Sequence, residues 1–295
     1  MHELNFINYL KKTIKYKTDV ICGIGDDAAV LKHTKNKHLL FASDMLVEGV
    51  HFSRNTKPID IGWKAIAVNA SDIAAMGGVP KYVVISAGLP ERRALKVLKR
   101  ILEGAKKACK KFNIQIVGGD TNKGKNLVID VSIIGEVEKK CLTLRSGAKQ
   151  GDFIFVTGEL GKGKEKHLNF IPRLKEARTL VRNFKINSMI DISDGLFLDF
   201  YRIAEASRVG GVIYKSLIPL GEGAKMKNAL SGGEDFELLF TLSIKEAKRL
   251  ILYMARHKYP PVTLIGEVVL KSRGLNFVGD EGRVSKIRPK GYMHF

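Results

Sequence analysis

Short strand-like runs alternate with longer helical stretches along all 295 residues, and this alternation restricts the chain to sheets covered by helices. Runs rich in Val, Ile and Phe predict strands, such as residues 153–157 and 262–269. Apolar residues at three- and four-residue spacing predict helices, such as residues 59–76 and 196–207. A hydrophobic content of 45% is that of a globular chain and excludes disorder, collagen and coiled coil.

A polar, glycine-containing segment, residues 138–151, separates two series of these elements. The chain is long enough for two domains that each bury a core. We therefore expect two α/β-type domains, residues 1–138 and residues 139–295.

Membrane and disulfide classes are not expected. No apolar run approaches the ~18 residues that cross a bilayer. The N-terminal MHELNFINYLKK lacks the apolar stretch of a secretory signal peptide, which predicts a cytoplasmic location. Cys22, Cys109 and Cys141 are an odd number without a CxxC pair, so they predict reduced thiols rather than a disulfide framework or a zinc ribbon.

The charge balance is strongly basic, with 50 Lys and Arg against 30 Asp and Glu, a formal net charge of +20. Such a protein attracts polyanions, including nucleic acid and nucleotide phosphates. The basic residues are not interleaved with aromatic residues, and no nucleic-acid motif is present. We interpret most of the charge as a solvated surface and expect no specific nucleic-acid partner.

The acidic residues are few, and one set occupies unusual places. Asp72 falls within the apolar stripe of the helix expected at residues 59–76. Six more follow apolar runs where a strand is expected to give way to a glycine-rich turn or a helix: Asp26, Asp27, Asp44, Asp120, Asp191 and Asp194. Any one of them could be a turn or cap residue, and an N-cap is especially plausible for Asp194. The whole set exceeds what caps require and predicts a hard divalent cation with oxygen ligands, Mg²⁺, Mn²⁺ or Ca²⁺.

Three glycine-rich segments add a second component: GGDT at residues 118–121, SDG at 193–195 and SGGED at 231–235. Turns of this kind can direct backbone N–H groups at an anion. None is a Walker A loop, and none is a GxGxxG segment after a strand. Carboxylates for magnesium, amide-rich turns and a basic chain together favour nucleotide phosphates and phosphoryl transfer.

Seven motifs in order carry a family resemblance: GIGDDAAVL, SDMLVEGVHF, WKAIAVNASDIAAMGGVP, VGGDT, LTLRSGAKQGD, IDISDGL and LSGGEDFEL. The series resembles the thiamine-monophosphate kinases, which share a superfamily with aminoimidazole-ribotide synthetase, selenophosphate synthetase and a hydrogenase maturation factor. The resemblance runs from about residue 23 to the C-terminal KGYMHF. It implies an α+β, two-domain PurM-like architecture, in which the N-terminal mixed sheets of two subunits pair across a dimer axis and a C-terminal α/β domain follows. A homodimer is therefore expected.

The resemblance also implies a reaction. The γ-phosphoryl group of ATP would pass to thiamine monophosphate by direct in-line attack, giving thiamine diphosphate and ADP with the help of several Mg²⁺ ions. Such a reaction requires positioning and charge neutralisation, so no covalent or general-base residue is expected.

Site roles follow from the same resemblance. The expected magnesium ligands are Asp27, Ser43, Asp44, Asp72, Asp120, Asp191 and Asp194, with Asp26 assisting Asp27 or orienting its loop. The expected ATP contacts are Gly119, Asp120, Arg145 and Ser193. The expected substrate contacts are His51, Glu234 and Tyr292.

Three of these residues have simpler explanations. His51 in its apolar context could be a core histidine, Tyr292 could anchor the C-terminus, and Arg145 could be an ordinary linker charge. The chain also departs from the family between residues 158 and 187, where it is shorter and more basic.

Two other functions stay open. One is another ATP-dependent synthetase of the superfamily, acting on a ribotide or another small metabolite. The second is a basic nucleic-acid-binding protein whose Asp residues are structural. Asp120→Asn would separate them, because turnover would collapse in either enzyme whereas polyanion binding would persist.

Overall fold

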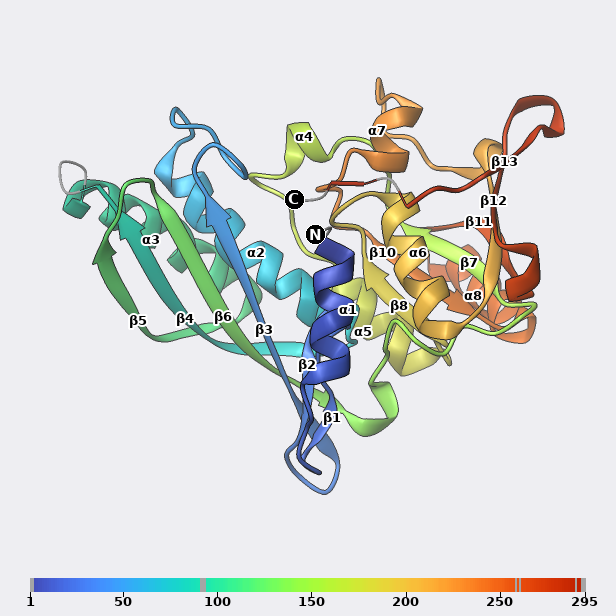
Figure 1. Ribbon diagram of the computed structural model, residues 1–295, viewed down its shortest axis with the longest axis horizontal. Helices are drawn as coiled ribbons and strands as arrows, with labels where there is room; N and C mark the ends of the chain where they lie inside the picture. The colour runs from blue at the N-terminus through green and yellow to red at the C-terminus, as the bar shows by residue number, and fades with distance from the viewer. Residues whose placement is uncertain (1–2, 91–93, 258, 260, 290, 293–295) are drawn as a thin grey trace.

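The computed structural model describes residues 3–90, 94–257, 259, 261–289 and 291–292. Two mixed sheets lie side by side, each covered by helices (Figure 1). The N-terminal half contains α1 (Glu3–Thr13), β1 (Val20–Cys22), β2 (Ala29–Lys32), β3 (Lys37–Val47), α2 (Pro58–Ala75), β4 (Val79–Leu89), α3 (Ala94–Phe112), β5 (Gln115–Lys123) and β6 (Val128–Glu138). Its sheet has the order β1-β2-β3-β6-β4-β5, in which only the β4–β5 pair is parallel.

The C-terminal half forms the second sheet, with the order β13-β12-β9-β11-β7-β10-β8. Its elements are β7 (Phe153–Thr157), α4 (Gly163–Lys166), α5 (Leu174–Asn183), β8 (Ser188–Asp191), α6 (Leu196–Ser207), β9 (Gly210–Tyr214), α7 (Met226–Ser231), β10 (Leu238–Leu242), α8 (Ile244–His257), β11 (Val262–Val269), β12 (Leu275–Val278) and β13 (Val284–Lys286). The sheets thus fall on the two sides of the expected domain boundary at residues 138 and 139, which stays a prediction.

Helix α2 joins the two halves. It is apolar on nearly every side, as expected of a helix enclosed by protein. One continuous core contains its side chains, the inner face of the first sheet and the side chains of α5 and α8, such as Leu180 and Leu250. A second core lies under α6 on the opposite face of the second sheet. The last turn of α2 is therefore held firmly between the two sheets.

In the part of the chain that the structure describes, no helix covers the outer face of the first sheet (Figure 1). Strand alternation directs one set of side chains to this face. Its large apolar members are between 37% and 58% exposed: Phe41, Met45, Tyr82, Val84, Val117 and Ile134. An exposed apolar patch of this kind marks a surface for association.

Two of the expected turns are wrong. Strand β3 continues past Asp44 to Val47, and β5 continues through residues 118–121. The backbone in both places pairs with a neighbouring strand instead of turning. Gly119 is needed for this pairing, because a Cβ there would lie 2.0 Å from the carbonyl oxygen of Ile85. The expected helices at residues 59–76 and 196–207 are confirmed as α2 and α6.

Other expectations concern single residues and membranes. The three cysteines are free thiols, as predicted. Among the described residues, no helix is both long enough and apolar enough to cross a membrane.

Candidate active site

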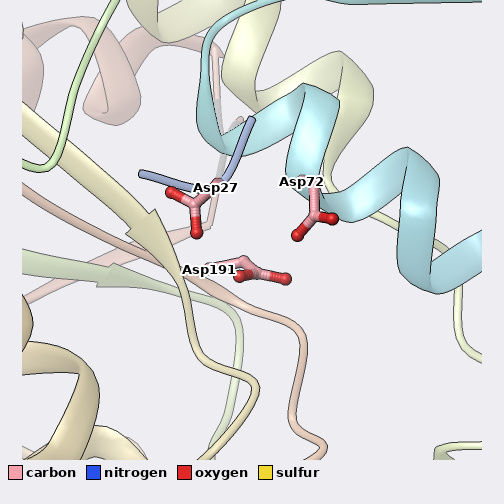
Figure 2. A group of neighbouring side chains, drawn as sticks. All are labelled: Asp27, Asp72 and Asp191. Atoms are coloured by element: carbon pink, nitrogen blue, oxygen red, sulfur yellow. The ribbon is translucent and has the colours of Figure 1, made fainter. Parts of the chain in front are cut away.

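Three carboxylates meet between the two sheets (Figure 2). Asp27 comes from the loop between β1 and β2, Asp72 from the last turn of α2, and Asp191 from the end of β8. Each offers an oxygen, and these oxygens all lie within 4.8 Å of one another. Residues from both halves of the chain thus form one acidic cluster, which we call the carboxylate triad.

Burial and mutual repulsion disfavour the simultaneous ionisation of the three carboxyl groups of the triad. Burial first, and then repulsion from Asp44 and Asp191, raise the pKa of Asp72 well above its ordinary value. Burial and the charge of Asp27 raise the pKa of Asp191 in the same direction, although the Ser71 hydroxyl donates to Asp191 at 2.5 Å. One oxygen of Asp27, Oδ2, is buried and has no hydrogen-bond partner among the residues that the structure describes. An all-oxygen site with an unpartnered oxygen fits Mg²⁺.

The triad lies in a cavity of about 1050 Å³ that both halves of the chain line. Asp44, His51, Ser193, Asp194 and Tyr292 all contribute to its wall. The backbone N–H of Tyr292 donates to the Asp194 carbonyl at 3.1 Å, which brings the C-terminal segment to the cavity. His51 Nδ1 accepts a hydrogen bond from the Val47 N–H at 3.0 Å, so this ring nitrogen is turned toward its own loop.

Two arginines neutralise the acidic groups. Arg145 Nη2 lies 2.6 Å from Asp27 Oδ1, and ion pairing with Asp27 raises the Arg145 pKa against the effect of burial. Arg202 Nη1 lies 2.6 Å from a carboxylate oxygen of Asp194 and 2.6 Å from one of Asp199. Both arginines line the cavity, so both can also meet an anionic ligand there.

The expected N-cap at Asp194 is wrong. Gly195 occupies the cap position of α6 with φ of 111°, and no side chain caps the helix. Asp199, one turn into the helix, accepts hydrogen bonds from the N–H groups of Asp194 and Gly195 instead. The Asp194 side chain instead lines the cavity, where its carboxylate pairs with Arg202.

Asp26 lies behind Asp27 and orients its loop. Its carboxylate accepts the Arg145 backbone N–H through both oxygens at 3.1 Å. Burial first, and repulsion from Asp27 second, raise the pKa of Asp26 to about 7. The Cys22 thiol lies 4.0 Å from the same carboxylate.

This arrangement makes Cys22 a slow nucleophile. Burial and the Asp26 charge raise the pKa of the Cys22 thiol to about 11, so little thiolate exists at pH 8. We expect iodoacetamide to alkylate Cys22 more than about tenfold more slowly than glutathione at pH 8. Asp26→Asn should accelerate the reaction, because it removes a charge that opposes the thiolate. Peptide mass spectrometry measures both rates, and a glutathione-like rate in the unmodified protein would contradict this environment.

Three of the expected site residues face another side of the sheet. Ser43 points to the outer face, where its hydroxyl lies 3.1 Å from the Ser132 hydroxyl and 3.2 Å from Asp130. Gly119 and Asp120 lie on β5, away from the carboxylate triad. Asp120 lines a separate, smaller cavity of about 190 Å³ together with Asp130 and Asn122.

Register shows how far Asp120 is from the triad. Asp120 pairs with Ser86, Ser86 with Asp130, and Asp130 with Met45. Three strand spacings of ~4.8 Å therefore put about 14 Å between Asp120 and Met45, on the outer face. Asp44, the neighbour of Met45, points to the inner face. Within one chain Asp120 does not meet the triad.

Comparison with known proteins places the whole chain. Residues 25–137 match the family model "AIR synthase related protein, N-terminal domain". A thiamine-monophosphate kinase of Buchnera aphidicola (subsp. Acyrthosiphon pisum) is 36% identical over 317 residues, covering 97% of this chain and 96% of the relative. One of Bacillus subtilis is 34% identical over 326 residues, covering 100% of both chains. The chain belongs to the thiamine-monophosphate kinase family.

Solved structures agree with this membership in the thiamine-monophosphate kinases. One described as "AaThiL complexed with AMPPCP and TMP" has a TM-score of 0.85 at 33% identity and covers 100% of this chain and 97% of its own. A thiamine monophosphate kinase from Aquifex aeolicus has a TM-score of 0.79 at 32% identity, covering 96% and 98%. The hydrogenase maturation protein HypE of E. coli shares the fold alone, with a TM-score of 0.72 at 21% identity. The expected two-domain, PurM-like α+β fold is confirmed.

The roles predicted from resemblance to this kinase family left out part of the site, although Lys64 stands within the quoted motif WKAIAVNASDIAAMGGVP. Lys64, Arg202 and Asp199 were not singled out, although Lys64 and Arg202 line the cavity and Asp199 supports Arg202. The helical spacing could have indicated Lys64. It precedes Asp72 by eight residues and so lies on the same broad face of the helix. Arg202 carried no signal, because its two acidic partners are recognised only once α6 is in place.

Proposed function

We propose that the protein transfers the γ-phosphoryl group of ATP to thiamine monophosphate, giving thiamine diphosphate and ADP. The observation that carries this proposal is the carboxylate triad, in which both halves of a thiamine-monophosphate kinase chain bring Asp side chains to one cavity. A cavity of about 1050 Å³ has room for two ligands, a nucleotide and a second phosphate ester.

The transfer is direct and in line. An oxygen of the thiamine monophosphate phosphate forms a bond to the γ-phosphorus of ATP, while the bond from that phosphorus to the β–γ bridging oxygen breaks. The electron pair of the broken bond stays on ADP. Since the attacking phosphate oxygen is already ionised near neutral pH, no protein base is required.

Several Mg²⁺ ions are proposed at the acidic wall. One ion would be held by the carboxylate triad, Asp27, Asp72 and Asp191. Further ions would be held by Asp44 and Asp194, which line the same cavity. Bound Mg²⁺ would neutralise phosphate oxygens and reduce the repulsion between the two anionic substrates.

The chain itself supplies the remaining positive charge. Arg145 and Arg202 are held at the cavity by Asp27, Asp194 and Asp199, and their forked donors match phosphate oxygens. We propose Ser193 beside them as a further ATP contact. In the same cavity we propose His51, Glu234 and Tyr292 for the substrate, with the Tyr292 ring packed on a thiamine ring.

A homodimer would give Asp120 a role. Two copies that bury the apolar outer faces of their first sheets can be related by a two-fold axis running along the strands. If the axis passes between β6 and β4, it sets β5 of one copy opposite β3 of the other, because it reverses the strand order. Ser43 and Met45 face outward on β3 and also line the large cavity. We propose that Gly119 and Asp120 of the partner subunit complete the nucleotide and metal site at this edge.

An acceptor comparison tests the function. ADP release is measured with ATP and Mg²⁺ in the presence of thiamine monophosphate, thiamine, an aminoimidazole ribotide precursor, or no acceptor. We expect turnover only with thiamine monophosphate. Turnover with a ribotide instead would assign the protein to another activity of the superfamily. A cytoplasmic location stays a prediction.

A further inference from the structure

The side chain of Lys64, on α2, is only 1% exposed at the wall of the large cavity. Its ammonium group contacts three partners: the His51 carbonyl oxygen at 2.9 Å, His167 Nδ1 at 2.6 Å, and a carboxylate oxygen of Glu234. An ammonium group has three N–H donors, and these contacts use them all. A buried charge with a full set of partners is held rigidly, because losing any partner is costly.

The three partners come from separate parts of the fold. His51 lies in the segment between β3 and α2, His167 directly follows α4, and Glu234 lies between α7 and β10. Lys64 therefore connects α2, in the N-terminal half, to two segments of the C-terminal half, those of His167 and Glu234, at the cavity wall. Two of the residues that it holds, His51 and Glu234, are those proposed above to contact the substrate.

Glu234 is held in a conformation that its own backbone disfavours. Its φ is 62°, in the left-handed region that non-glycine residues rarely adopt. The Glu234 carboxylate is fixed by the Lys64 ammonium group, which also donates to His167 Nδ1. A backbone conformation of this kind persists only when the surroundings determine it, and it is common where a side chain must be aimed.

His167 is itself fixed by a neighbour of Glu234. The Asp235 carboxylate accepts hydrogen bonds from three successive backbone N–H groups, those of Gly161, Lys162 and Gly163, at 2.9–3.1 Å. This contact sets the start of the short helix α4, and His167 comes one residue after its end. The short, basic segment at residues 158–187 is thereby attached to the loop that contains Glu234, a proposed substrate contact.

We propose that Lys64 is a positioning residue for the phosphate acceptor: it fixes the Glu234 carboxylate and the His51 segment in the orientation that binds thiamine monophosphate, and His167 holds the ammonium group in place. The inference rests on the proposed function and extends it to Lys64 and His167, which act through Glu234 and His51. Arg145 and Arg202, proposed above for ATP, are held instead by Asp27, Asp194 and Asp199.

Steady-state kinetics of Lys64→Met test the proposal. We expect KM for thiamine monophosphate to rise at least tenfold, whereas KM for ATP stays within twofold. Combining Lys64→Met with Glu234→Gln should raise KM for thiamine monophosphate no further than the more severe single change, because both act on one contact. Lys175→Met, at an exposed position on α5, is the matched control and should change neither constant.

His167→Ala provides a second route should Lys64→Met not fold. It should raise KM for thiamine monophosphate several-fold and leave KM for ATP unchanged. Equal increases for both substrates, or unchanged values for thiamine monophosphate in the folded variants, would overturn the inference while the kinase activity stood. A native protein that forms no thiamine diphosphate would refute the proposed function, and this inference with it.

Discussion

Asp72→Asn should reduce the rate of thiamine diphosphate formation by about 10³-fold, or about 4 kcal/mol of transition-state stabilisation. Asparagine keeps the size of the side chain but removes the charge of one of the three carboxylates that we propose as magnesium ligands. The remaining activity should respond weakly to Mg²⁺ concentration. Rates measured over a range of Mg²⁺ concentrations test this expectation, and a variant that retains full Mg²⁺-dependent activity would contradict it.

The same substitution should stabilise the metal-free protein. Since folding raises the pKa of Asp72 and Asp191, the folded state binds more protons than the unfolded chain above the ordinary Asp pKa. The free energy of unfolding therefore falls as pH rises above that value. Because asparagine does not titrate, the free energy of unfolding of Asp72→Asn should fall less over the same pH range. We expect a Tm higher by roughly 2–4 °C per kcal/mol gained, in EDTA at neutral pH.

Ser71→Ala provides the control for that measurement. It removes the hydroxyl that donates to Asp191 and leaves all three carboxylates in place. Its Tm in EDTA should fall, because a stabilising hydrogen bond to a charged group is lost. If Asp72→Asn also lowers the Tm in EDTA, repulsion among the three carboxylates does not destabilise the metal-free folded state.

Mixing two inactive variants should restore activity. Asp120→Asn and Asp72→Asn homodimers should each be inactive. In a heterodimer of the two, one site combines the intact triad of the first subunit with the intact Asp120 of the partner subunit, while the other site has neither. Each heterodimer should therefore have about half the native activity, because one of two symmetric sites is complete.

Recovery of activity in the heterodimer distinguishes the two possible positions of Asp120. If Asp120 served the triad of its own chain, both sites of the heterodimer would contain a defect and no activity would return. Co-expression with two different affinity tags isolates the heterodimer for the assay. Tyr82→Glu supplies a further comparison, because a charge on the exposed apolar face should weaken the dimer and lower activity with it.

Periodicity placed some of the site correctly from sequence alone. The spacing of Ile61, Ala65 and Val68 on the helix predicted that Asp72 would share their buried face, and it does line the cavity beside Val68. Strand alternation carried a further signal: it separates Ser43 from Asp44, which occupy opposite faces of β3. Local patterns of this kind depend only on the geometry of one element.

Features that depend on distant pairing could not be predicted. Glycines at positions 118 and 119 suggested a turn, but β4 provides backbone partners and close packing that keep them in a strand. Lys64 meets His167 and Glu234 across 103 and 170 residues of sequence, so no local pattern indicates the contact. The separation of Asp120 from the triad likewise follows from strand order, which the motifs do not contain.

We propose that this chain uses its carboxylate triad to phosphorylate thiamine monophosphate. The most direct test incubates the protein with thiamine monophosphate, Mg²⁺ and ATP carrying ¹⁸O in its γ-phosphoryl group, and identifies the product by mass. We predict thiamine diphosphate that carries the label with the native protein, and almost none with Asp72→Asn. Absence of labelled thiamine diphosphate, or equal amounts from both proteins, would contradict the claim.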